Sequence, residues 1–176
     1  MKCQWKQNKY LWKTKMAASP PVKFLLQTPN NFPNLKNKHM KRVTAIGGIF
    51  FKCDNPDAQK EWYAKHLGIA MDKFGTSFEW RHSDNKEQKG YSAWSPFEKD
   101  TDYFGAPSQQ YMINYRVDDL DALIKQLKEE GVTIVDQMEI FEYGKFVHIL
   151  DGEGNRVELW EANDDVYGKM LNAVTK

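Results

Sequence analysis

The chain has 176 residues, of which 41% are hydrophobic and 14% aromatic, enough to bury a core, so a wholly disordered protein is excluded. Its longest apolar run, Ala45–Phe51, is far shorter than the ~20 residues that a membrane span requires. Two cysteines, Cys3 and Cys53, exclude a disulfide framework and an all-cysteine zinc site. We therefore predict a soluble protein of the reducing cytoplasm.

The net charge of +1 conceals a strong asymmetry along the chain. Residues 1–42 hold nine lysines, Arg42 and no acid, which leaves 15 basic against 24 acidic residues in the rest. Such an arm is typical of nucleic-acid binding, membrane surfaces or targeting peptides. This arm has no regular apolar period, no apolar segment of signal-peptide length and no stacking platform for bases. Residues 1–40 are therefore predicted to be a disordered extension, or to precede a natural start at Met40, and a nucleic-acid role is disfavoured.

The first predicted module covers residues 43–95. Its opening strand is Val43–Cys53, which is rich in β-branched and aromatic residues. Asn55 and Pro56 favour a helix start, because asparagine caps helices and proline suits their first turn, and Gly68 favours the helix end. Three short strands are expected to follow, over residues 70–74, 76–82 and 90–95, with a polar loop between the last two.

Residues 96–109 lack periodicity and are predicted to connect to a second module over 110–161. A strand over Tyr111–Val117 precedes a helix that opens at Asp119, keeps apolar residues at a 3,4 spacing and ends at Gly131. The remaining elements are expected to be strands at 132–135, 145–150 and 155–161, with a hairpin turn before the last and a C-terminal tail over 164–176.

The two modules match each other at a constant shift of 64 residues. Lys52–Asp57 falls on Arg116–Asp121 and Gly90 falls on Gly154, although the helix ends miss by one residue. Two copies are too few for a solenoid and indicate two modules that close one shared site. The predicted fold is α+β, with two tandem βαβββ modules forming a single cup-shaped mixed-sheet domain within residues 41–163.

Several short motifs occur in a characteristic order between residue 43 and about residue 162. They are Trp62-Tyr63, Leu67-Gly68-Ile69, Val117–Asp121, Gly131-Val132 and Asp151–Trp160. With this order and spacing the chain resembles the vicinal oxygen chelate superfamily, which includes glyoxalases, bleomycin-resistance proteins and extradiol dioxygenases. The resemblance implies that each module curls four strands into half of a cup. It also implies a homodimer, because many relatives pair.

Metal-using members of this superfamily place one ligand in each first strand and one in each fourth strand. The corresponding positions in this chain are Gly48, Trp94, Met112 and Glu158. Glycine has no side-chain donor, tryptophan offers only an N–H, and a methionine thioether suits copper(I) better than divalent ions. A register error of one residue would bring in Gly47 or Tyr111, and neither is a good ligand. We therefore expect no metal and no other cofactor, even with His148 on the strand beside Glu158.

Alternate strand positions share one face, so Met112, Asn114 and Arg116 are expected to point together, with Asn114 in the cup and Arg116 nearer its rim. Trp160 shares a face with Glu158. Trp94 is a candidate for a stacking wall with Trp80 and Tyr91, and ordinary core packing is the alternative for Trp80. The candidate ligand-binding residues are Gly48, Trp94, Met112, Asn114, Arg116 and Trp160.

Glu158 and His148 are the candidate catalytic residues. A carboxylate in an aromatic-lined cup suits a general base, and histidine exchanges protons near neutral pH. The alternative is that Glu158 merely pairs with Arg116 or His148 and that His148 is a structural hydrogen-bonding residue. The acidic segments 98–102 and 139–142 are predicted to be solvated loops, or alternatively to flank the cup mouth and favour a cationic ligand.

The sequence thus predicts a metal-free small-molecule binding protein of the glyoxalase/bleomycin-resistance type that holds its ligand in the shared cup. The alternative is a glyoxalase-like lyase or isomerase that uses Glu158 as general base, with or without a divalent metal. The expected partner in both cases is a small-molecule ligand, and no membrane is expected to be involved.

Overall fold

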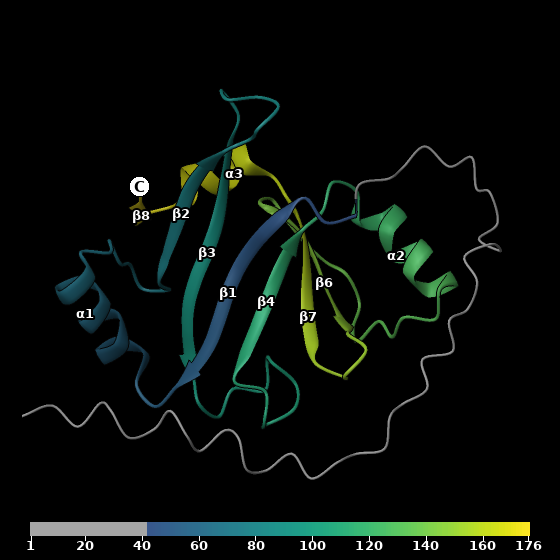
Figure 1. The fold of residues 1–176 in the computed structure, drawn as a ribbon, viewed down its shortest axis with the longest axis horizontal. Coiled ribbons are helices and arrows are strands. Elements are labelled where there is room, and N and C mark those ends of the chain that lie inside the picture. The colour runs from purple at the N-terminus through teal and green to yellow at the C-terminus, as the bar shows by residue number, and fades with distance from the viewer. Residues whose placement is uncertain (1–41) are drawn as a thin grey trace, which may run out of the picture. The chain divides into compact units, whose positions relative to one another are not determined.

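The computed structural model describes residues 42–176, so the predicted extension over residues 1–40 lies outside the described residues (Figure 1). Within this part of the chain, eight strands form one mixed sheet in the order β5-β6-β7-β4-β1-β3-β2-β8, accompanied by three helices. The predicted α+β fold with a single mixed sheet is confirmed. None of the described helices is long and apolar enough to cross a membrane.

The first half contains β1 (Ala45–Cys53), α1 (Pro56–Leu67), β2 (Thr76–Arg81) and β3 (Lys89–Glu98). The helix begins and ends as predicted. The side chain of Asn55 accepts a hydrogen bond from the backbone N–H of Ala58 at 2.9 Å. Gly68 ends the helix with a left-handed backbone at φ 67°. Helix α1 packs on the sheet through Tyr63, whose ring centroid lies 4.7 Å from that of Trp94.

The predicted strand over residues 70–74 is wrong. The carboxylate of Asp72 accepts hydrogen bonds from the backbone N–H groups of Phe74 (2.8 Å) and Gly75 (3.1 Å), and this local turn replaces strand pairing. The neighbour of β2 is instead β8 (Val174–Thr175), which runs parallel to it. The segment treated as a C-terminal tail therefore folds, as α3 (Asp164–Met170) and β8, against the first half.

The second half contains β4 (Tyr111–Arg116), α2 (Leu120–Glu129), β5 (Glu139–Phe141), β6 (Gly144–Leu150) and β7 (Arg156–Ala162). The predicted strand over 132–135 is reduced to an isolated bridge between Ile134 and Ile149, and the segment 139–142, predicted to be a loop, contains β5. Both segments lie beside β6. Backbone pairing with β6 is interrupted between the two segments, because the side chain of Asp136, not its backbone, accepts a hydrogen bond from the N–H of His148 (2.9 Å).

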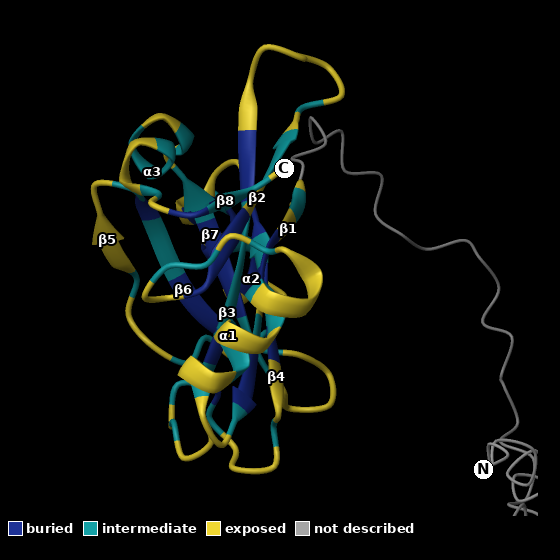
Figure 2. Ribbon diagram, turned by 90° about the vertical axis from the view of Figure 1, so that its left-hand side faces the viewer, coloured by how far each residue is buried: buried dark blue, intermediate teal, exposed yellow. Residues whose placement is uncertain are grey.

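The two halves meet where β1 and β4 pair in antiparallel fashion at the centre of the sheet, with β3 parallel to β1 and β7 parallel to β4. One face of the second half packs on the apolar side of α2, and Leu159 belongs to that core. Alternate residues of β7, Glu158 and Trp160, therefore point to the opposite face. On that side lie α3 and β5 (Figure 2), so the sheet, α3 and β5 enclose the space considered below.

Replacement of Leu120 by alanine tests the α2 core. Leu120 is fully buried, whereas Leu67 at the end of α1 is 58% exposed. We expect Leu120→Ala to lower the free energy of unfolding by about 2–5 kcal/mol, because it leaves a cavity, and Leu67→Ala to change it by less than about 1 kcal/mol. Urea denaturation of both variants measures the difference. Equal losses would contradict the packing of α2 against the sheet.

Candidate ligand-binding site

A cavity of about 310 Å³ lies on the face of the sheet opposite α2. Its lining comes from both halves of the sheet, from the connection between them and from α3. The polar side chains are those of Ser95, Asn114, Glu139 and Glu158, and the described lining residues include no lysine or arginine. Eight aromatic side chains line the cavity: Phe50, Phe97, Tyr103, Phe141, Tyr143, Phe146, Trp160 and Tyr167.

Glu158 is the buried carboxylate of this cavity, with only 2% of its surface exposed. Parallel pairing of β4 and β7 places Asn114 beside it, and Nδ2 of Asn114 donates a hydrogen bond to Oε2 at 2.5 Å. The hydroxyl of Tyr103 donates to the other oxygen, Oε1. Burial and the adjacent Glu158 carboxylate both raise the pKa of Tyr103, so this phenol stays protonated and remains a donor. Neutral donors thus hold both carboxylate oxygens.

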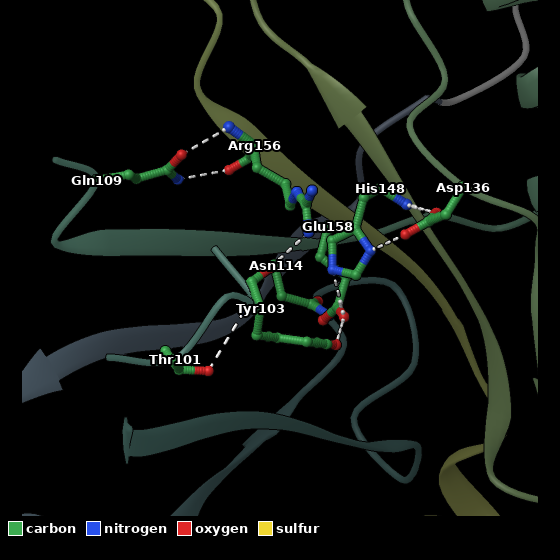
Figure 3. Close-up of polar contacts among 8 residues, drawn as sticks. All are labelled: Thr101, Tyr103, Gln109, Asn114, Asp136, His148, Arg156 and Glu158. Atoms are coloured by element: carbon green, nitrogen blue, oxygen red, sulfur yellow. Dashed lines mark hydrogen bonds and ion pairs between the residues drawn. The ribbon is translucent and has the colours of Figure 1, made fainter. Parts of the chain in front are cut away.

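His148 approaches the same carboxylate from β6, where it pairs directly with Glu158 (Figure 3). Its Nε2 lies 3.3 Å from Oε1 of Glu158, an ion-pair contact that lacks the alignment of a hydrogen bond. Its Nδ1 lies 2.6 Å from Oδ2 of Asp136, which is partly exposed. Burial by itself lowers the pKa of His148, but the carboxylates of Glu158 and Asp136 outweigh burial and raise it overall. Asp136, His148 and Glu158 thus form a continuous polar chain from the surface to the cavity.

The connection between the two halves is attached to β7, and this attachment positions Tyr103. The side chain of Gln109 donates to the carbonyl of Arg156 and accepts from its N–H, each at 2.8 Å. The guanidinium of Arg156 donates to the carbonyl of Tyr103 at 3.0 Å. Figure 3 shows how these contacts bring the phenol toward Glu158. The connecting segment is therefore part of the site.

The prediction that Arg116 lies near the rim of the cup is wrong. Arg116 is 95% buried and is not part of the cavity lining. It donates to the carbonyl of Tyr91 (3.1 Å) and to Oδ2 of Asp164 (2.5 Å). Its guanidinium lies 5.3 Å from the ring centroid of Trp80 and 4.9 Å from that of Trp160. The reason for the difference is α3, which supplies the partner carboxylate from a segment that the sequence analysis treated as a tail.

The four positions expected to converge were Gly48, Trp94, Met112 and Glu158, and strand pairing brings together a different set. Gly48 pairs with Ala93 and with Asn114, and Asn114 pairs with Glu158. The constant 64-residue shift fails because paired residues of β1 and β3 are one residue further apart in the sequence than paired residues of β4 and β7. Because Asn114 is the residue of β4 that pairs with Glu158, Met112 does not lie beside Glu158 as predicted. Met112 is buried opposite Phe50 of β1.

Trp94 does not reach the cavity, because it has the opposite orientation on β3 and packs against Phe51 and Tyr63 instead. The expected wall of Trp94, Trp80 and Tyr91 is therefore absent from the lining of the cavity. Trp160 and Asn114 do line it. Gly47, rather than Gly48, faces this space: a Cβ there would lie 2.0 Å from Oδ1 of Asn114.

The residues at the paired positions do not fit a divalent metal. Gly48 and Ala93 offer no side-chain donor, which leaves Asn114 and Glu158. Catalytic metal sites generally use three protein ligands, and the further nitrogen beside Glu158 is Nε2 of His148. The carboxylates of Glu158 and Asp136 raise the pKa of His148 and so favour its protonated form, which has no lone pair for a metal. Asn114 and Glu158 remain as oxygen ligands, and the amide nitrogen of Asn114 already donates to the carboxylate of Glu158.

Tyr103 and Asp136 are the functional candidates that the sequence analysis did not identify. Tyr103 lies within 96–109, which was interpreted only as a connection, and Asp136 follows the predicted strand 132–135. The one available signal was the density of aromatic residues in the connection, where Phe97, Tyr103 and Phe104 occur within eight residues.

The raised pKa of His148 predicts how stability depends on pH. Its contacts with Glu158 and Asp136 stabilise the folded protein below the unfolded pKa of about 6.5 and are lost as pH rises through the folded value. We therefore expect wild type to lose stability relative to His148→Gln between about pH 5.5 and about pH 9. Urea denaturation at both values measures this, and Asp136→Asn should weaken the dependence. A difference that is independent of pH would contradict it.

Comparisons with known proteins agree with this architecture. Residues 45–159 match the family described as Glyoxalase/Bleomycin resistance protein/Dioxygenase superfamily, whereas no curated protein matches the chain. Methylmalonyl-CoA epimerase from Mycobacterium tuberculosis has a TM-score of 0.52 at 19% identity, over 76% of this chain and 97% of that one. A Streptomyces coelicolor methylmalonyl-CoA epimerase in complex with 2-nitronate-propionyl-CoA has a TM-score of 0.53 at 18% identity, over 69% and 99%. These likenesses concern the fold, and the family match shows that the chain belongs to the glyoxalase/bleomycin resistance protein/dioxygenase superfamily.

Proposed function

We propose that this protein binds a small planar cation in the aromatic cavity, without a metal and without transforming it. The observation that carries the proposal is the composition of the lining. Eight aromatic side chains and the carboxylates of Glu139 and Glu158 line the cavity, and no lysine or arginine is among the described lining residues. Such a lining favours positive charge and disfavours an anion.

The aromatic side chains suit a flat molecule because two pairs of them are nearly parallel, which gives the lining planar surfaces. Phe97 and Tyr103 are nearly parallel, with ring centroids 5.5 Å apart, and so are Phe146 and Trp160, at the same separation. The faces of such rings carry negative potential and attract cations. A volume of about 310 Å³ lies at the small end of ligand cavities and matches a ligand of about two fused rings.

The fixed geometry of Glu158 favours binding over turnover. Tyr103 and Asn114 donate to its two oxygens, so the carboxylate is held in one orientation before a ligand arrives. A rigid, buried counter-charge improves affinity because no side chain has to be ordered on binding. The same donors compete with any substrate proton that the carboxylate would take up. The paired positions also supply only two donors, fewer than the three protein ligands of a typical catalytic metal site.

One observation favours the alternative, a glyoxalase-like lyase or isomerase with Glu158 as general base. The chain of Asp136 and His148 reaches the Glu158 carboxylate and would carry an abstracted proton toward the surface. This alternative requires that Glu158→Gln abolish turnover of a substrate that the parent protein converts. A Glu158→Gln variant with full activity would exclude Glu158 as the base.

Calorimetric titration of metal-stripped protein tests the proposal with N-methylquinolinium as cation and 1-naphthoate as an anion of similar shape. We expect one cation to bind per chain, with at least tenfold preference over the anion. Glu158→Gln should weaken cation binding about tenfold, because a buried charge contact is worth roughly 1.5–3 kcal/mol. Glu153→Gln, in the exposed turn before β7, should change nothing.

Three results would overturn the proposal or parts of it. Equal affinity for cation and anion would contradict electrostatic selection by the cavity. Binding that appears only after a divalent metal is added would contradict metal-free binding. Chemical conversion of the bound compound, followed by chromatography after long incubation, would favour the enzymatic alternative.

A further inference from the structure

A second cavity, of about 440 Å³, adjoins the first. Ala93, Ser95, Tyr143 and Tyr167 line both cavities, so the two share a boundary. Ala93 and Ser95 are alternate residues of β3 and lie on the same face of the sheet. The rings of Tyr143 and Tyr167 have centroids 6.4 Å apart. The two spaces are therefore adjacent, with an inner lobe at Glu158 and an outer lobe beyond the two tyrosines.

The outer lobe is apolar and open at its far end. Its walls include Phe74, Met170 and Leu171, of which Phe74 is 72% and Met170 54% exposed. No lysine or arginine is among the described residues that line it. Its acidic residue, Asp72, already accepts hydrogen bonds from two backbone N–H groups of its own turn. The hydroxyls of Thr76, Ser77 and Ser95 in its lining already have hydrogen-bond partners. The lobe therefore suits a hydrocarbon chain better than a phosphate.

The segment that forms the outer lobe is attached firmly to the sheet. Asp164, at the start of α3, pairs with the buried Arg116, and the hydroxyl of Tyr167 is hydrogen-bonded to that of Ser77 at 3.0 Å. Pairing of β8 with β2 holds the segment at its other end. The outer lobe is thus a built part of the fold.

We infer that the ligand is an elongated amphipathic cation whose planar head occupies the inner lobe and whose unbranched apolar tail runs through the outer lobe. This inference rests on the proposed function, because the head group is the planar cation proposed above. The tail gains affinity by leaving water, at roughly fourfold for each methylene that is fully buried. Partial exposure of Phe74 and Met170 reduces this gain but does not remove it.

A comparison of N-methylquinolinium with N-octylquinolinium tests the inference by calorimetry. We expect the octyl compound to bind wild type at least tenfold more tightly. Met170→Glu places a carboxylate on the wall of the outer lobe and should reduce the affinity for the octyl compound about tenfold, with no loss for the methyl compound. Ile140→Glu is the matched control, because Ile140 is 70% exposed and lines neither lobe, and it should leave both affinities unchanged.

The outcomes separate the inference from the proposed function. If the methyl compound binds and the octyl compound binds no more tightly, the tail has no site and the inference is overturned. The same holds if Met170→Glu weakens both compounds equally or if Ile140→Glu reproduces its effect. If the octyl compound alone binds and Met170→Glu abolishes binding, the outer lobe is supported and recognition of the planar head fails.

Discussion

The burial of one carboxylate organises this molecule. Glu158 lies on an inner strand with almost no exposed surface, and an unpartnered charge at that depth would cost several kcal/mol. Polar side chains from separate parts of the chain contact it: Asn114 from β4, His148 from β6 and Tyr103 from the connection between the halves. His148 and Tyr103 are in turn anchored, by the carboxylate of Asp136 and by the guanidinium of Arg156. Glu158 therefore links β4, β6 and the connecting segment around the cavity.

A second buried charge plays the corresponding role for the C-terminal segment. Arg116 is held by Asp164 and by a backbone carbonyl, and its guanidinium lies near the rings of Trp80 and Trp160. Through this contact α3 is fixed over the face of the sheet that carries Glu158. The two buried charges lie on neighbouring strands and do not contact each other. The carboxylate of Glu158 faces the cavity, whereas the guanidinium of Arg116 pairs with Asp164 outside the cavity lining. This separation accounts for a cavity whose lining, among the residues that the structure describes, includes carboxylates and no lysine or arginine.

The family to which the chain belongs commonly places metal ligands on its paired strands, and this chain retains one carboxylate there. Asn114 donates its amide to that carboxylate, while Gly48 and Ala93 complete the set without donors. What remains is a carboxylate that accepts hydrogen bonds from Asn114 and Tyr103, contacts His148 and is surrounded by aromatic rings. These surroundings are the basis on which we propose a binding role rather than metal chemistry.

The sequence by itself determined the features that depend on neighbours along the chain. Helix caps at Asn55 and Asp119, the apolar period of α2 and the alternation along β4 and β7 are local, so the α+β fold and the inward orientation of Asn114, Glu158 and Trp160 could be predicted. Only the tertiary structure decided which side chains contact Glu158. Tyr103 is 55 residues from Glu158 and Asn114 is 44, and such pairings depend on register, which a slip of one residue reverses for every side chain of a strand. That slip misplaced Trp94. The turn at Asp72 and the docking of β8 depend on side-chain hydrogen bonds and edge pairing that leave no periodic signal in the sequence.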